Sequence, residues 1–237
     1  MKGDINADVV AVVSDVPSCG GVAYAKDHGI PTLTYPASKK GLFPGLTPQE
    51  LVQQLKHELG ADYVLLAGYL KLIPAELVSA YRRAMLNIHP GLLPSFGGKG
   101  CMGSACMQRC SARGQAAAFS SAGLPVRAPQ CCNEHVVSAG MSFLLPGKYA
   151  LPAAPAIAHS PTRRFSGPTV HFVDEEYDTG PILAQRCVQV FPTDSAKQLA
   201  ARVLEQEHQV YPYAVSALVD SRITWREDGV PIIWEAR

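Results

Sequence analysis

Three apolar runs, each bounded by turn or helix signals, constrain the fold of this chain more than any other feature. They occupy residues 7–15 (ADVVAVVSD), 62–69 (DYVLLAGY) and 84–89 (AMLNIH). Short continuous runs of β-branched and aliphatic residues are typical of strands buried on both faces of a parallel sheet. Helix signals separate these runs, so the sequence predicts an α/β fold: a doubly wound, mostly parallel sheet with helices on both faces.

The helix signals are local and specific. Thr47 has the character of an N-cap, Pro48 suits the first turn, and Glu50 stands at the capping-box position. We expect Pro212 to break or restart the last helix, because proline lacks the N–H that a helix interior needs. A hairpin is predicted at the end of the chain, around Asp228-Gly229. The sequence predicts helices over 22–28, 47–59, 74–81 and from 195 onward, and later strands over 169–173 and 182–190.

Composition limits the classes of function. The chain has 237 residues, 47% of them hydrophobic, and a formal net charge of +1. This predicts one globular domain over residues 1–237 and gives no reason to expect a nucleic acid or an anionic membrane as a partner. No apolar run reaches the roughly 18 residues that a transmembrane helix needs. The first residues have no signal-peptide or transit-peptide character.

An asparagine and a histidine stand two residues apart where the third run ends. Asn87 and His89 precede Pro90-Gly91, a turn that stops the strand. Residues i and i+2 of a strand project from one face, and open α/β sheets place their sites at the carboxyl ends of strands. An amide can donate a hydrogen bond to a developing oxyanion, and an imidazole can move a proton near neutral pH. The pair suits attack on a carbonyl, although it also fits a strand end that satisfies loop backbone.

Two blocks carry a resemblance to a known family. Residues 86–94 (LNIHPGLLP) and 167–181 (GPTVHFVDEEYDTGP) resemble the signatures of the folate-dependent formyltransferases. The likeness runs through about residues 7–100 and 166–225 and leaves out 101–165. It implies transfer of a formyl group from 10-formyltetrahydrofolate to the amine of glycinamide ribonucleotide in purine biosynthesis, with no metal. The stretch 204–212 (LEQEHQVYP) favours this branch over methionyl-tRNA formyltransferase-like enzymes and formyltetrahydrofolate deformylases.

The resemblance also implies roles for single residues. Asn87 and a protonated His89 would stabilise the oxyanion, and Asp178 would hold His89, because a nearby carboxylate favours the charged imidazolium. The folate would contact two segments, and two further residues would contact the substrate. The residues expected to contact folate are Leu70, Lys71, Leu72, Ile73, Asn87, Asp174, Glu175, Glu176, Tyr177 and Asp178. The residues expected to contact the substrate are His171 and Glu207.

Plainer interpretations exist for several of these residues. Asp178 also fits an ordinary turn aspartate, and His171 fits a core histidine on a strand. Glu207 also fits a solvated helix face. The segment 70–73 also fits a strand-to-helix loop, and 174–178 an acidic surface turn.

Two departures from the family pattern are expected. The resemblance places a central strand and a Gly/Ser-rich phosphate loop before residue 7, and we expect both to be missing here. Residues 101–165 lack sustained periodicity and are predicted to be a disordered insertion. A zinc site is the alternative for that segment, but the spacings of its ligands do not match a paired C-x₂-C pattern. The candidate ligands would be Cys106, Cys110, Cys131, Cys132 and His135.

These departures leave a second hypothesis open, namely a catalytically impaired or inactive variant. The partners expected for the active protein are the two small-molecule substrates, with no nucleic acid and no membrane. We expect a monomer or homodimer, located in the cytoplasm or the plastid stroma.

Overall fold

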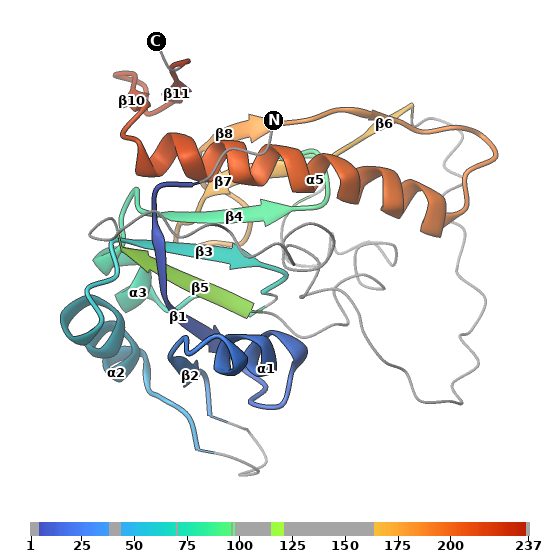
Figure 1. The fold of residues 1–237 in the computed structure, drawn as a ribbon. Coiled ribbons are helices and arrows are strands. Elements are labelled where there is room, and N and C mark those ends of the chain that lie inside the picture. The colour runs from blue at the N-terminus through green and yellow to red at the C-terminus, as the bar shows by residue number, and fades with distance from the viewer. Residues whose placement is uncertain are drawn as a thin grey trace, which may run out of the picture.

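A seven-stranded mixed sheet forms the centre of the molecule (Figure 1). The structure is a computed structural model that describes residues 5–37, 44–69, 71–95, 97, 115–120 (backbone only) and 164–235. In sheet order the strands are β2 (Thr32–Thr34), β1 (Asp8–Ser14), β5 (Gln115–Ser120), β3 (Tyr63–Ala67), β4 (Met85–His89), β7 (Thr169–Phe172) and β8 (Ile182–Gln185). Only β5 and β7 run against the other five strands. The predicted α/β architecture with a mostly parallel sheet is confirmed.

Helices cover both faces of this sheet, as the sequence predicts. On one face, α2 (Pro48–Val52), the π-helical turn η1 (Gln53–Glu58) and α3 (Ala75–Ala80) pack on a cluster that includes Val64, Leu66 and Met85. On the other face, α5 (Ala196–Val219) packs on Leu65 and Leu86. Consecutive residues along β3, and likewise along β4, thus enter the hydrophobic cores on opposite faces of the sheet. This explains why both runs are apolar without alternation. Another helix of the described residues, α1 (Gly20–Asp27), contacts β1.

Strand β5 lies in a segment whose residues show no periodic pattern of a helix or strand. It pairs antiparallel with both β1 and β3 and so occupies a central position in the sheet. Its sequence, QAAAFS, is short and half alanine, a residue with low β-propensity. Pairing with two strands overrides that preference. The predicted disordered insertion therefore differs from the structure at 115–120, while 101–114 and 121–163 lie outside the described residues.

Helix ends and the final hairpin follow the local signals closely. Thr47 accepts a hydrogen bond from the Glu50 N–H, and Glu50 accepts one from the Thr47 N–H, so the predicted capping box is present. The predicted hairpin consists of β10 (Ile223–Trp225) and β11 (Pro231–Ile233). The strand predicted over 182–190 divides into β8 and β9 (Val188–Gln189), and β9 pairs with β6 (Phe165–Ser166) in a separate sheet.

The last helix contradicts one expectation. Pro212 lies inside α5, which continues unbroken from Ala196 to Val219. Residues on both sides of the proline, including Tyr211 and Ala214, are buried against the sheet. The Tyr211 hydroxyl reaches the carbonyl oxygens of Leu66 (2.9 Å) and Leu86 (3.2 Å). This tertiary packing holds the helix together across the proline. Among the described helices, none is both long and apolar enough to cross a membrane.

Candidate active site

Asn87 and His89 come from β4, which pairs with β3 on one side and β7 on the other. Leu86 and Ile88 enter the core under α5, so the alternating residues Asn87 and His89 project from the opposite face. His89 is the last residue of β4 and is only 9% exposed. The structure therefore places the pair on one face at the carboxyl end of a central strand, as the spacing predicts.

Asp178 reaches this strand end from the loop that follows β7. Its Oδ1 lies 3.6 Å from Nδ1 of His89 and 3.7 Å from Nε2 of His171. The Asp178 backbone is left-handed, with φ = 57°, a conformation that aspartate adopts more readily than most residues. Gly180 closes the loop, because a Cβ at this position would collide with the carbonyl oxygen of Phe172. The loop thus delivers a carboxylate between two imidazole rings.

His171 is the register partner of Asn87 on β7, and its ring fixes the orientation of the Asn87 amide. The Nδ1–H of His171 donates to the Phe172 carbonyl oxygen at 2.8 Å, so Nε2 is the acceptor. The Nδ2 of Asn87 lies 3.0 Å away and donates to it. Burial lowers the pKa of His171, an effect that outweighs the opposing influences of the Phe172 carbonyl and Asp178. A neutral ring is the form that can accept this hydrogen bond.

This arrangement has the parts needed for chemistry at a carbonyl. An amide Nδ2 has two hydrogens, and His171 takes one, which leaves the other to point at a substrate oxygen. His89 and Asp178 form an imidazole–carboxylate pair at a distance that one water molecule can bridge. Oxyanion stabilisation and proton transfer can therefore act at a single point.

The first segment expected to contact folate is only partly described. Leu70 lies outside the described residues. Lys71 forms an ion pair of 2.7 Å with Asp15, which follows β1. Leu72 is half-exposed and Ile73 is buried in the core beneath α3. The pairing with Asp15 places Lys71 at the carboxyl ends of the parallel strands, near the same edge of the sheet as His89.

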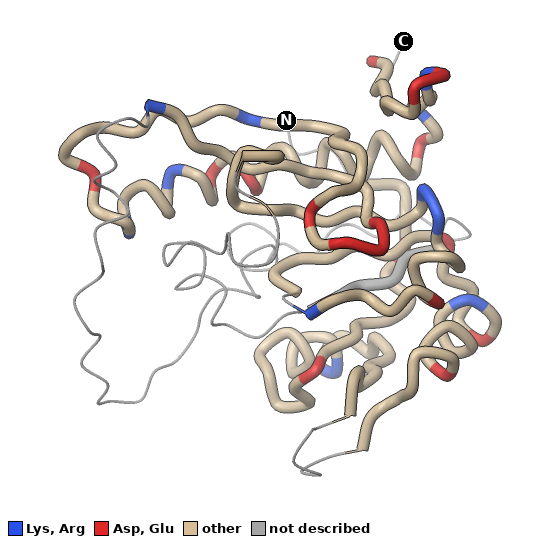
Figure 2. The backbone as a smooth tube through the Cα atoms, turned by 180° about the vertical axis from the view of Figure 1, so that it is seen from behind, with Lys and Arg blue, Asp and Glu red and all other residues tan. Residues whose placement is uncertain are grey.

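The second segment, 174–178, is an ordered loop at the end of β7. Asp174 accepts hydrogen bonds from the Glu176 N–H (3.3 Å) and the Thr179 hydroxyl (2.7 Å), so its carboxylate closes the loop on itself. Glu175 and Glu176 are exposed, and Tyr177 is half-buried. Figure 2 shows acidic residues in several parts of the described chain, and the longest acidic run of the sequence is 174–176.

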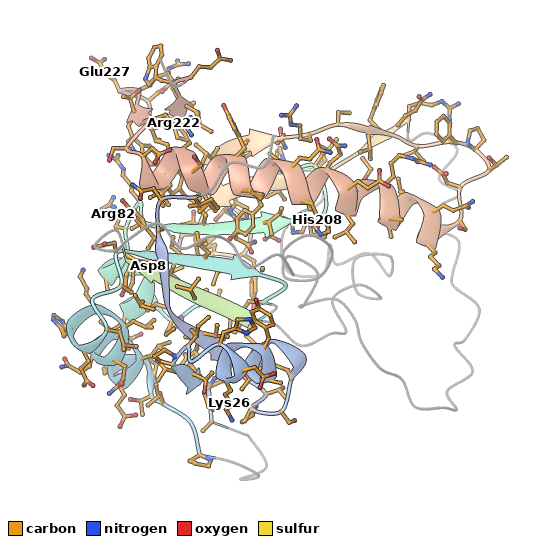
Figure 3. All side chains as sticks on the ribbon, in the orientation of Figure 1. Asp8, Lys26, Arg82, His208, Arg222 and Glu227 are labelled. Atoms are coloured by element: carbon orange, nitrogen blue, oxygen red, sulfur yellow. The ribbon has the colours of Figure 1, made fainter. Side chains whose placement is uncertain are left out.

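Glu207 is buried on α5, with 8% of its surface exposed. This burial excludes the alternative of a solvated helix face. Figure 3 shows the side chains along α5, including the labelled His208 that follows Glu207 in sequence. The helix packs on β4, β7 and β8, on the face of the sheet opposite to the one from which Asn87 and His89 project.

Two residues of this region were missed by the sequence analysis. Thr169 and Gln185 bind the turn after His89 through side-chain hydrogen bonds. Thr169 stands in the second signature block, but only the strand register shows that it lies opposite His89. The candidate zinc ligands in 106–135 lie outside the described residues, and the part of the chain that is described holds no group of three or more metal-ligating side chains.

Comparison with known proteins gives a consistent assignment. The family model described as formyl transferase matches residues 1–124 and 144–215. That match includes much of 101–165, which the sequence analysis had placed outside the likeness. The chain is 42% identical over 231 residues to "Phosphoribosylglycinamide formyltransferase, chloroplastic" of Arabidopsis thaliana, covering 98% of this chain and 62% of that protein. It thus spans about three fifths of the length of this relative.

Solved structures share the fold. The crystal structure of phosphoribosylglycinamide formyltransferase from Anaplasma phagocytophilum superposes with a TM-score of 0.65, at 24% identity, covering 100% of this chain and 86% of that one. The enzyme of the same name from Brucella melitensis is 31% identical, with a TM-score of 0.53, covering 89% of this chain and 80% of that one.

Proposed function

This chain belongs to the formyl transferase family, and from that premise we propose that it transfers a formyl group from 10-formyltetrahydrofolate to the amine of glycinamide ribonucleotide. The amine nitrogen forms a bond to the formyl carbon, and the bond between that carbon and N10 of the folate breaks. One amine proton is lost, and N10 gains a proton. The relatives named above carry the name of this activity, which supports the choice of substrates.

The observation that carries the proposal is the convergence of Asn87, His89 and Asp178 at one strand end. Asn87 donates its second Nδ2 hydrogen to the oxyanion of the tetrahedral intermediate. His89 stabilises the same oxyanion when protonated. Asp178, 3.6 Å from the ring, holds His89 and assists proton movement through water. Groups used in this way typically contribute about 10²- to 10⁴-fold to the rate.

The remaining roles are assigned by position. The folate lies against 71–73, where Lys71 pairs with Asp15, and against the 174–178 loop, from which Asp178 reaches His89. Glu207 binds the glycinamide amine, and His171 lines the substrate site through Asn87. The name of the Arabidopsis relative refers to the chloroplast, which supports the plastid stroma as the location of this chain. We propose a monomer or homodimer that acts on these two small molecules.

A formyl-transfer assay tests the proposal. The purified 237-residue chain is incubated with both substrates, and formylated glycinamide ribonucleotide is followed by mass spectrometry. We expect product with the natural sequence and at least a hundredfold less with Asn87→Ala or His89→Ala. If the natural chain is itself an inactive variant, it will form no more product than His89→Ala. If formate is released whether or not the amine is present, the chain is a hydrolase instead. Either result would overturn the proposed activity.

A further inference from the structure

We propose that Thr169 and Gln185 are positioning residues that clamp the turn Pro90–Pro94 onto β7 and β8 and thereby set His89 relative to Asp178. This inference rests on the proposed function. We refer to the side chains of Thr169 and Gln185 together as the clamp. Neither residue touches the reacting groups in the arrangement described above, so the clamp acts through the turn.

The clamp is built from four hydrogen bonds, three of which involve the Thr169 hydroxyl. The Thr169 hydroxyl donates to the Gly91 carbonyl oxygen at 2.7 Å and accepts from the Leu93 N–H at 3.1 Å. Gln185 Nε2 donates to the Thr169 hydroxyl at 2.9 Å and to the Leu93 carbonyl oxygen at 3.0 Å. A hydroxyl has one donor and two acceptor positions, and all of them are used here. Both backbone polar groups of Leu93 are thus fixed by the clamp.

Burial makes these bonds important to the turn. Thr169 is 0% exposed and the Leu93 side chain is buried against the same region. Without the hydroxyl, the Gly91 carbonyl oxygen and the Leu93 N–H would lose their partner in a place with little access to water. Unpaired buried backbone groups are costly, so the turn would move to find other partners.

The turn is connected to both members of the His89–Asp178 pair. Thr169 is the register partner of His89, and Gly91 comes only two residues after that histidine. Farther along, the chain passes close to Asp178, since a Cβ added at Gly97 would lie 2.9 Å from the Asp178 Cβ. A shift of the turn therefore changes the position of the ring at one end and presses on the carboxylate at the other.

Two matched variants test the clamp. Thr169→Val keeps the shape and removes the hydroxyl, whereas Thr169→Ser keeps the hydroxyl. We expect Thr169→Val to lower kcat by about 10- to 100-fold, because misplacing a catalytic group by about 1 Å costs up to about 10² in rate. KM for glycinamide ribonucleotide should change less than about threefold. The pH profile of kcat should shift in the valine variant and be restored in the serine variant.

A readout independent of activity accompanies the kinetics. Amide hydrogen exchange of Leu93 should accelerate at least about tenfold in Thr169→Val and stay slow in Thr169→Ser, because only serine keeps the acceptor. If the valine variant does not fold, Gln185→Met serves, since Gln185 is on the exposed end of β8 and its amide makes two of the four bonds. In that variant we expect both a lower kcat and faster Leu93 exchange. Gln189→Met, on the separate β6–β9 sheet, is its control.

The outcomes separate this inference from the proposed activity. Suppose that the natural sequence is inactive but that its slow Leu93 exchange becomes faster in Thr169→Val. This result would overturn both the proposed activity and the kinetic role of the clamp. An active natural sequence whose kcat, pH profile and Leu93 exchange are unchanged by Thr169→Val and Gln185→Met would overturn the clamp alone. Loss of stability in Thr169→Val with an unchanged kcat and pH profile would show a merely structural threonine and would also overturn it.

Discussion

Asn87 and His171 are register partners on antiparallel strands, and Nδ2 of the asparagine donates to Nε2 of the histidine across 3.0 Å. The other ring nitrogen is committed to the Phe172 carbonyl oxygen, so the histidine can serve only as an acceptor at Nε2. This fixes which end of the Asn87 amide faces the ring. The amide is therefore held in the orientation that an oxyanion donor needs before any substrate binds.

Replacing His171 should lower the rate through Asn87. In His171→Phe the Asn87 amide loses its acceptor and can rotate, and we expect kcat to fall by about 10-fold or more while the folate KM changes little. His171→Gln offers a carbonyl oxygen as acceptor and should recover part of the rate. Steady-state kinetics of the two variants measure this. Equal losses in both would contradict an orienting role.

The same histidine should make stability depend on pH. Burial lowers the pKa of His171 below its reference of 6.5. Between the lowered value and about 6.5, the unfolded chain binds a proton that the folded chain does not, so stability falls as the pH falls. The slope from this residue is at most about 1.4 kcal/mol per pH unit. Urea unfolding between pH 5 and 7.5 should show a shallower slope for His171→Phe, and an unchanged slope would refute the burial argument.

Neutralising Asp178 should remove the carboxylate that both imidazole rings face. We expect Asp178→Asn to lower kcat by about 10²- to 10⁴-fold with little loss of stability, since asparagine also tolerates the left-handed backbone found there. Asp228→Asn, in the turn of the terminal hairpin, is the matched control and should keep full activity. Formyl-transfer rates and thermal unfolding of both variants provide the comparison. A fully active Asp178→Asn would exclude the carboxylate from the reaction.

A partly buried ion pair at the start of α5 should matter more than an exposed one. Arg202 binds both carboxylate oxygens of Asp194 at 2.8 Å and holds the pKa of this buried acid at about 2. Asp194→Asn should lower the free energy of unfolding by about 1.5–3 kcal/mol. The exposed pair Arg226–Asp228 should contribute at most about 1 kcal/mol, so Asp228→Asn is again the control.

The pH dependence of this pair has the same sign as that of His171, because the pKa of each group is lowered in the folded chain. The folded pKa of Asp194 is depressed, so its stabilisation is present above the unfolded value of about 3.9 and is lost as the pH falls toward about 2. Urea unfolding at pH 7 and pH 3 should show the difference between the natural chain and Asp194→Asn shrinking at the lower pH. A difference that stays constant would argue against the ion pair as its source.

Pro212 offers a test of how α5 is held together. Pro212→Ala restores a backbone N–H inside the helix and removes the clash of the ring with the preceding turn. We expect a gain of about 1–2 kcal/mol in stability, because restoring the helix bond outweighs the roughly 0.4–1 kcal/mol by which proline restricts the unfolded chain. Chemical denaturation measures it. A loss of stability would mean that the ring itself packs favourably at this position.

The sequence alone determined the parts of this protein that depend on neighbouring residues. The capping box at Thr47–Glu50, the buried runs of β1, β3 and β4, and the hairpin at Asp228-Gly229 follow from spacings of a few positions. The pairing of Asn87 with His89 on one strand face has the same origin, since alternation along a strand is local.

Only the tertiary structure decided the rest, because strand pairing joins residues far apart in the chain. It placed β5 between β1 and β3 despite its alanines, and it carried α5 through Pro212 by packing both sides of the proline. It brought Asp178 and His171 to the strand end of residues 87 and 89, and Thr169 and Gln185 to the turn beyond. Such contacts depend on sheet register and burial, which no local pattern contains.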